Sequence, residues 1–250
     1  SVGGATDVAK ETASLILLDS NFGTLVNTVE EGRIIFENIK KVVAYVLSNS
    51  FAEITLIFGA MLLGLPTPLS VAQILWIHLI CDGPSDIVLG FEKGETDVME
   101  EPPKSMKESI LDSRGKILIL AISIISAVSS LFLFWYFWQV YNDVASGRSI
   151  VFTVLAVQEL IYIFSYRSFR RSIFKSGNFF ANKALFATVT FGFGQQLLAL
   201  YVPALNNVLN VVPLHLSDWA LVLTVAFGMM LVVEVVKYAT NQTRKRNRTE

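Results

Sequence analysis

VVAYVLSNSFAEITLIFGAMLLGL, residues 42–65, is an apolar run whose only charged side chain is Glu53. A helix that crosses a bilayer needs about 20 mostly apolar residues, so this run predicts a membrane span. A charge at the bilayer centre costs about 2.5–3.5 kcal/mol even on insertion scales, and a carboxylate halfway along a span therefore favours a functional role. The stretch predicts both a membrane helix and a candidate site.

Five further runs are long and apolar enough to be spans, at residues 71–91, 117–140, 149–166, 183–202 and 217–238. The composition agrees, because 53% of the residues are hydrophobic and only 16% are charged, which is unlike an ordinary soluble domain. We therefore predict an all-α polytopic membrane protein with six transmembrane helices.

The first 41 residues have a different character. SLILLD at residues 14–19 is typical of a short buried strand, and NFGTLVNTVEEGRIIFENIKK at 21–41 has apolar residues at helical spacing. The helical part runs into the first span without a proline. We expect a soluble strand and helix that continue directly into the membrane.

Basic residues concentrate in one set of the connections between the predicted spans. That set and the C-terminal tail contain Lys93, Lys104, Lys107, Arg114, Lys116, Arg167, Arg170, Arg171, Lys175, Arg244, Lys245, Arg246 and Arg248. The opposite connections contain one basic residue, Arg148. Cytoplasmic loops carry the excess of Lys and Arg, so we expect the N-terminal segment, the 92–116 linker and both chain ends to be cytoplasmic.

Two more carboxylates lie near the middle of predicted spans, Asp82 in the second and Glu159 in the fourth. At about 1.5 Å rise per residue, these two and Glu53 are each roughly 15 Å from either membrane face. All three can therefore meet at one depth. Hydrogen bonding between packed helices is the alternative interpretation, but three carboxylates at matched depth favour a shared cation site.

Other polar groups lie at helical spacing from these carboxylates. Gly83-Pro84 follows Asp82 and predicts a helix break whose free carbonyls could also coordinate a cation. Such oxygen-rich sites suit hard cations such as Ca²⁺. Cys81 is either a ligand or a packing residue, and Asp86 is either functional or hydrated from the cytoplasm. The candidate metal-site residues are Glu53, Asp82, Glu159, Asn49, Ser50, His78, Cys81 and Asp86.

Charge and cysteine content exclude several classes. The 20 Lys and Arg residues nearly balance the 21 Asp and Glu residues, so the total charge by itself does not indicate a class of partner. We expect no nucleic-acid partner. The lone cysteine excludes an internal disulfide framework, and no Cys/His cluster has zinc spacing. The opening SVGGATDVAKE has no targeting pattern, and we expect the chain to be part of a longer protein.

Two stretches resemble P-type cation-transporting ATPases of the calcium-pump group. ATDVAKETASLILLDSNFGTLVNTVEEGRIIFENIKK, residues 5–41, is similar to the end of the family's phosphorylation domain. ILWIHLICDGPSDIVLGFEKGETDVMEEPPK, residues 74–104, resembles the calcium-pump pattern around its DG pair. The resemblance implies that residues 1–41 end a cytoplasmic phosphorylation domain and form a stalk helix, and that 42–250 form a six-helix membrane domain with a basic tail.

The resemblance also implies an ATP-driven pump in which Glu53, Asp82 and Glu159 fall on cation-ligating positions. The sequence contains no DKTGT, TGES or TGDGVNDAPAL motif. We therefore expect ATP and Mg²⁺ to bind outside this chain, in a missing N-terminal part with actuator, nucleotide-binding and phosphorylation domains and four more spans. Besides that part, the expected partner is the lipid bilayer.

The sequence departs from the calcium-pump pattern at several places, including Pro84-Ser85, where the pattern has Leu-Pro after the DG pair. Ser50, His78 and Cys81 stand where the pattern has Asn, Asn and Thr, and Asp86 stands where it has an uncharged residue. Ca²⁺ is the preferred ion, with H⁺, Na⁺ or Mn²⁺ as alternatives. A secondary cation transporter and a non-catalytic membrane subunit remain as alternative classes.

Overall fold

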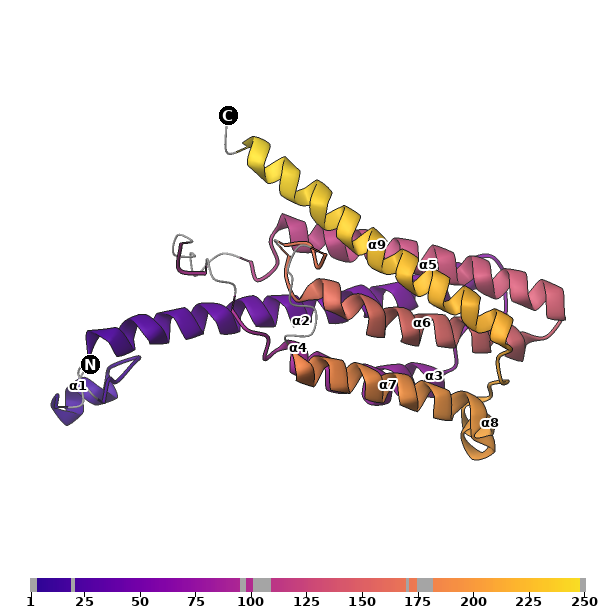
Figure 1. Cartoon of the computed structure of the whole chain (residues 1–250), viewed down its shortest axis with the longest axis horizontal. Helices are drawn as coiled ribbons and strands as arrows, with labels where there is room; N and C mark the ends of the chain where they lie inside the picture. Colours follow the sequence, from indigo (N-terminus) through magenta and orange to yellow (C-terminus); the bar gives the residue numbers. More distant parts are fainter. Residues whose placement is uncertain are drawn as a thin grey trace.

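The computed structural model describes residues 4–18, 21–94, 98–100, 109–169, 171–174 and 182–247. Within them, the long helices form one bundle, and one helix projects far beyond its end while the C-terminal part of the last helix diverges from its side (Figure 1). The segments are α1 (Asp7–Glu11), α2 (Phe22–Leu62), α3 (Val71–Trp76), the π-helical turn η1 (Ile77–Cys81), α4 (Gly83–Leu89), the 3₁₀ turn η2 (Val98–Glu100), α5 (Ser113–Tyr141), α6 (Val144–Tyr166), α7 (Lys183–Tyr201), α8 (Pro203–Leu209) and α9 (Leu216–Asn247).

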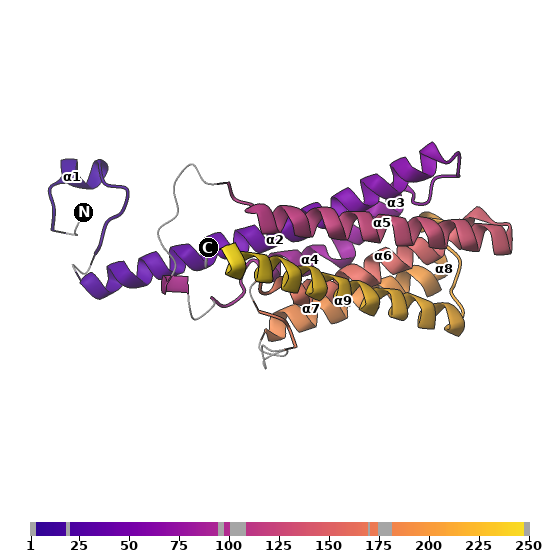
Figure 2. The same cartoon turned by 90° about the horizontal axis from the view of Figure 1, so that it is seen from above.

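The projecting helix is α2, which contains 41 residues and is therefore about 60 Å long. Its first residues follow Asn21, whose side chain accepts a hydrogen bond from the Gly23 amide at 2.8 Å. The N-terminal half extends beyond the bundle, and the C-terminal half packs along its side (Figures 1 and 2). The predicted unbroken helix from the soluble segment into the first span is confirmed.

Among the described residues, five helices are long and apolar enough to cross a membrane, namely α2, α5, α6, α7 and α9. Besides Asn21 at the start of α2, acidic or amide side chains cap the amino ends of three more of these helices. Asp112 caps α5, Asp143 caps α6 and Asn182 caps α7, each by accepting a backbone N–H of the first turn. These caps satisfy amide groups that a helix end leaves without partners, so local sequence sets where each span begins.

The second predicted span is not one continuous helix. Residues 71–91 form α3, then η1, then α4, and the short apolar part at Val71–Cys81 is below the length of a spanning helix. The prediction of six transmembrane helices is therefore not confirmed for this segment, whereas the predicted helix break next to Gly83 and Pro84 is present. The physical reason is that Pro84 cannot continue the hydrogen bonding of a preceding helix. Asp82 is therefore outside the regular helices, and a new helix, α4, begins at Gly83 with Pro84 in its first turn, where proline is tolerated.

The predicted strand at 14–19 is not confirmed either. Of its described residues, 14–18, only Leu17 forms an isolated β-bridge, and Asp19 lies outside the described residues. A strand needs neighbouring strands for stability, and the described N-terminal segment contains the short helix α1 but no sheet.

Some of the basic residues used to predict the orientation lie outside the described residues, namely Lys104, Lys107, Arg170, Lys175 and Arg248.

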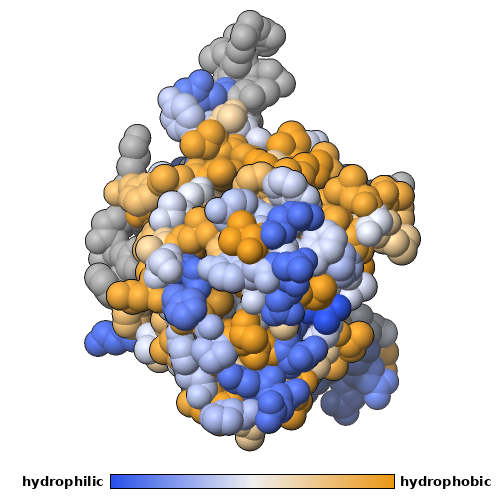
Figure 3. All heavy atoms as spheres, turned by 90° about the vertical axis from the view of Figure 1, so that its right-hand side faces the viewer, coloured by the Kyte–Doolittle hydropathy of each residue, from blue (hydrophilic) through white to orange (hydrophobic). Residues whose placement is uncertain are grey.

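The two ends of the bundle differ. The carboxyl ends of α4, α6 and α9 lie at the end from which α2 projects (Figures 1 and 2). Seen from the opposite end, hydrophilic residues gather over the middle of the face and hydrophobic residues lie around its rim (Figure 3). Large apolar side chains such as Ile54, Leu120 and Val235 are exposed along the sides. This distribution fits sides that contact lipid and ends that contact water.

The interior contains two apolar clusters with a polar layer between them. One cluster includes Leu56 of α2 and Leu155 of α6, and the other includes Tyr45 of α2 and Ile163 of α6. Glu53 and Glu159 lie between these pairs along their helices and are 4% and 0% exposed. The fold therefore places buried carboxylates at the level where the apolar packing is interrupted.

Candidate functional site

The polar layer is organised around His78 on η1. Its Nε2 lies 2.8 Å from Oε2 of Glu53 on α2, and its Nδ1 lies 3.9 Å from Oδ2 of Asp82. The imidazole is 28% exposed, whereas the Glu53 and Asp82 side chains are 5% and 1% exposed. His78 thus links two buried carboxylates from different helices and forms the accessible side of the cluster.

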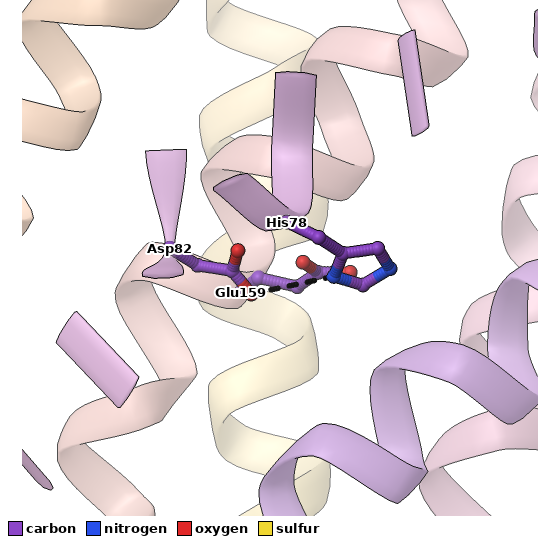
Figure 4. Close-up of side chains that lie close together, drawn as sticks. All are labelled: His78, Asp82 and Glu159. Carbon is purple, nitrogen blue, oxygen red and sulfur yellow. Dashed lines mark ion pairs between the residues drawn. The ribbon is translucent and has the colours of Figure 1, made fainter. Parts of the chain in front are cut away.

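Glu159 of α6 completes the cluster. Side-chain ligand atoms of His78, Asp82 and Glu159 all lie within 4.8 Å of one another, and the three side chains point toward a common centre (Figure 4). The structure therefore brings together all three carboxylates that the sequence places at mid-depth.

A hydrogen-bonded chain supports this cluster from α2 and α6. Asn49 donates from Nδ2 to Oδ2 of Asp82 at 3.2 Å. The hydroxyl of Tyr162 donates to Oδ1 of the same amide, which fixes the amide with its N–H group toward Asp82. Tyr162 lies one helical turn after Glu159, so one face of α6 supplies both a carboxylate and the group that orients Asn49.

The break in the second predicted span shapes the site. The Asp82 amide donates to the Ile77 carbonyl at 3.0 Å, the spacing of a π-helical turn, and such turns occur frequently at functional sites. A Cβ on Gly83 would lie 2.7 Å from the His78 carbonyl oxygen, so glycine is required for this close approach. Pro84 has no N–H to donate to the carbonyl of Ile80, four residues earlier.

Helix α7 packs directly behind the break. A Cβ on Gly192 would collide with the Cys81 carbonyl oxygen and lie 2.8 Å from Cδ2 of Leu160. Gln196, one turn later, accepts from Cys81 Sγ at 3.6 Å and donates to Oγ1 of Thr153 at 3.3 Å. The helix thus fixes η1 against α6 through a small residue and an amide.

Several buried carboxylate oxygens in and beside the cluster accept no hydrogen bond within the described part of the chain. Among the described residues they include Oε1 of Glu53, Oδ1 of Asp82, Oδ1 of Asp86 and both carboxylate oxygens of Glu159. A buried acceptor without a partner costs about 1–3 kcal/mol, and more if it is charged. The set therefore calls for positive charge, and carboxylate and amide oxygens are the ligands that hard cations prefer.

The remaining candidates are placed differently. Ser50 is half-buried on α2, and within the described chain no side-chain hydrogen bond joins it to the cluster. The thiol of Cys81 faces Gln196 on the α7 side. Asp86 lies one turn beyond Asp82, and its amide donates to the Asp82 carbonyl at 2.9 Å. The compact cluster therefore consists of Asn49, Glu53, His78, Asp82 and Glu159.

Sequence reasoning missed the supporting residues Tyr162, Gln196 and Gly192. A signal was present for Tyr162, which follows Glu159 by three residues and is therefore on the same helical face. For Gln196, the signal was an amide inside an apolar run. Gly192 carried none, because its role depends on how closely α7 approaches η1.

Buried apolar packing, apolar helices of membrane-spanning length and exposed apolar sides define a multi-pass integral membrane protein, and a cluster of buried carboxylates lies beside its helix break. The model of the family described as "Cation transporting ATPase, C-terminus" matches residues 66–239. The chain belongs to this family, which confirms the resemblance drawn from its motifs.

Several curated relatives match nearly the whole chain. "Calcium-transporting ATPase type 2C member 1" of Pongo abelii is 36% identical over 242 residues, covering 96% of this chain and 26% of the relative. "Calcium-transporting ATPase 1" of Bacillus cereus is 35% identical over 249 residues, covering 94% and 28%. "Calcium-transporting ATPase" of Bacillus subtilis is 34% identical, covering 96% and 26%. The chain thus spans about a quarter of the length of these relatives.

Proposed function

We propose that this chain is the ion-binding and ion-translocating membrane part of an ATP-driven P-type cation pump, with Ca²⁺ as its preferred ion. The observation that carries the proposal is the group of buried carboxylate oxygens without donors at the helix break. These three relatives are named calcium-transporting ATPases, which favours Ca²⁺. ATP hydrolysis, and the binding of ATP and Mg²⁺, would belong to the remainder of the longer protein.

The proposed ligands are the carboxylates of Glu53, Asp82 and Glu159, and Asn49 supports them by donating from Nδ2 to Oδ2 of Asp82. Calcium takes six to eight oxygen ligands at about 2.3–2.6 Å, so carbonyls near the break, water and groups from the rest of the protein would complete the shell. His78 occupies one Glu53 oxygen at 2.8 Å. We assign His78 the role of holding that carboxylate, which must turn away from the imidazole to present both of its oxygens to the ion.

The proposed topology has six crossings, with α3, η1 and α4 acting together as one broken span. Broken helices at mid-depth are a recurrent way for transporters to build ion sites. Residues 1–41 would end the phosphorylation domain and form the stalk, and residues 42–250 would form the membrane domain. The common end of α4, α6 and α9 carries most basic connections, so we place this end and both termini in the cytoplasm.

The proposed coupling runs along α2. Glu53 lies on the same continuous helix as the projecting residues 22–41. A tilt or rotation imposed on that projecting half would move Glu53 relative to His78 and Asp82, because an unbroken helix transmits rigid-body motion. Phosphorylation in the rest of the protein would thereby change access to the site.

ATP-dependent accumulation of ⁴⁵Ca²⁺ in sealed vesicles containing the full-length protein tests this function. We expect uptake that an ionophore releases, together with a calcium-dependent phosphoenzyme. Parallel assays with Mn²⁺, Na⁺ and pH gradients identify the ion. Calcium uptake that persists without ATP and follows an imposed ion gradient would contradict the pump and favour a secondary transporter.

Replacing Tyr162 by Phe should weaken ⁴⁵Ca²⁺ binding about twofold to tenfold. The variant loses one buried hydrogen bond, of net value about 0.5–1.5 kcal/mol, that orients Asn49 toward Asp82. Tyr45→Phe is the matched control, because the buried Tyr45 hydroxyl has no hydrogen-bond partner among the described residues. Equal effects of the two substitutions on the dissociation constant would contradict the orienting role.

A further inference from the structure

A second polar cluster lies outside the ion site and is centred on Glu92, three residues beyond the end of α4. Its carboxylate is 7% exposed and receives two hydrogen bonds from Arg167, which follows α6 directly. Arg167 Nε lies 2.9 Å from Oε2, and Nη2 lies 2.8 Å from Oε1. Two parallel hydrogen bonds of this kind fix both the distance and the relative orientation of the carboxyl ends of α4 and α6.

Two further helices are attached at the same residue. Asn182 donates from Nδ2 to Oε2 of Glu92 at 2.9 Å, while its Oδ1 caps α7 at the Leu185 amide. Asn38 of α2 donates to the Glu92 carbonyl at 2.6 Å and accepts from Lys41 Nζ at 3.0 Å. Glu92, which follows α4, is therefore hydrogen-bonded to Asn38 of α2, to Arg167 at the end of α6 and to Asn182 at the start of α7.

These four helices carry the proposed ligands, continue from them or pack against the helix break. Along the chain, Glu92 follows Asp82 by ten residues, Arg167 follows Glu159 by eight, and Asn38 precedes Asn49 by eleven. Asn182 precedes Gly192, which touches the helix break, by ten. At about 1.5 Å per residue, each attachment lies roughly 12–17 Å from the site.

We propose that Glu92 is a positioning residue, a joint that holds α2, α4, α6 and α7 in the register at which their side chains form the cation site. The inference rests on the proposed function, since it concerns the geometry of that same site. Because helices are stiff over this length, a shift at the joint displaces Asp82 relative to Glu159 and Asn49. Ion affinity, more than stability, is then the quantity that Glu92 controls.

The electrostatics of the joint agree with this role. Burial raises the pKa of Glu92, but hydrogen bonds from Arg167 and Asn182 and the charges of Arg167 and Lys41 outweigh it, so the net pKa lies below its usual value. The carboxylate is therefore charged at neutral pH. A buried ion pair adds little net stability compared with apolar packing, yet it specifies geometry.

A second buried ion pair supplies a matched control. Glu234 and Lys237 of α9 lie 2.7 Å apart and are 8% and 5% exposed. Lys237 also donates to the Ser165 carbonyl at 2.8 Å. This pair ties α9, which supplies none of the proposed ligands, to α6. Glu234→Gln should therefore reduce thermal stability without changing the affinity for calcium.

Equilibrium ⁴⁵Ca²⁺ binding and thermal unfolding of the purified full-length protein, compared for wild type, Glu92→Gln and Glu234→Gln, test the proposal. For Glu92→Gln we expect a Kd about threefold to thirtyfold higher than that of the wild type, the range for substitutions that act on a site at a distance, with unchanged maximal binding. Arg167→Lys keeps the positive charge but loses the paired hydrogen bonds to Glu92, and it should raise Kd in the same direction. This variant tests the proposal even if Glu92→Gln does not fold.

The outcomes separate the two hypotheses. A wild-type Kd in both Glu92→Gln and Arg167→Lys overturns the joint while the proposed function stands. A Kd shift in Glu234→Gln as large as in Glu92→Gln also overturns it, because general destabilisation would then explain both. A wild-type protein that binds no ⁴⁵Ca²⁺ overturns the proposed function, and the role of the joint with it.

Discussion

Glu53→Gln and Asp82→Asn should each abolish the calcium-dependent phosphoenzyme of the full-length protein at micromolar Ca²⁺. Each substitution keeps the side-chain shape but removes a negative charge from the buried cluster. Removing one partner of a buried ionic contact costs about 3–5 kcal/mol. That corresponds to binding weakened from about a hundredfold to a few thousandfold, because about 1.4 kcal/mol is tenfold.

The thermal stability of the ion-free protein should not fall with these two substitutions, although calcium binding does. Without an ion, the cluster contains several carboxylate oxygens that have no donor in the described chain. An amide in place of one carboxylate reduces that cost, so the ion-free variants should unfold at the wild-type temperature or above it, a trade-off between stability and function. Thermal unfolding in a calcium chelator measures this and distinguishes a lost ligand from a misfolded protein.

Glu30→Gln is the matched control, because Glu30 lies on the same helix as Glu53 and is exposed. It should leave calcium binding unchanged. An unaltered calcium dependence of the phosphoenzyme in both Glu53→Gln and Asp82→Asn would refute the assignment of the site.

Gly192→Ala should have the second largest effect. The added methyl group would collide with the Cys81 carbonyl oxygen and lie 2.8 Å from Cδ2 of Leu160. The first obstacle is backbone, so α7 must move away from η1 or the π-helical turn must be displaced. Overpacking of this kind costs about 1–3 kcal/mol. We expect a lower unfolding temperature and at least about tenfold weaker ⁴⁵Ca²⁺ binding, since misplaced ligands lose affinity steeply.

Gly194→Ala on the same helix isolates the steric effect. A Cβ at Gly194 meets no atom within 4 Å, and alanine favours helix over glycine by about 1 kcal/mol. This variant should be neutral or slightly more stable, with unchanged binding. If both substitutions reduce binding equally, the contact between α7 and the break does not control the site.

The spans and the identity of the central carboxylates follow from the sequence. Long apolar runs specify membrane helices because backbone polar groups must be paired within the bilayer. Glu53, Asp82 and Glu159 were found because charge is rare and costly at that depth. Their meeting at one level follows from helix rise alone, and the structure places them together around His78.

The form of the second span depended on more than local pattern. Gly83 and Pro84 predicted a break, but the π-helical turn begins six residues earlier, at Ile77. Its position is stabilised by α7, where Gly192 approaches the Cys81 carbonyl and Gln196 accepts from the Cys81 thiol. No periodicity in residues 71–91 contains that information, because the contacts come from residues more than 100 positions away.

The sequence by itself therefore determined the membrane class, the long helix α2 and the depth of the three carboxylates, since each depends on composition and on spacing within one helix. Only the tertiary structure decided which neighbours complete the cluster, that Cys81 faces Gln196, and that Glu92 joins Arg167, Asn182 and Asn38. These facts depend on the rotation and separation of packed helices. Side chains from distant parts of the chain set both quantities, so no single span specifies them.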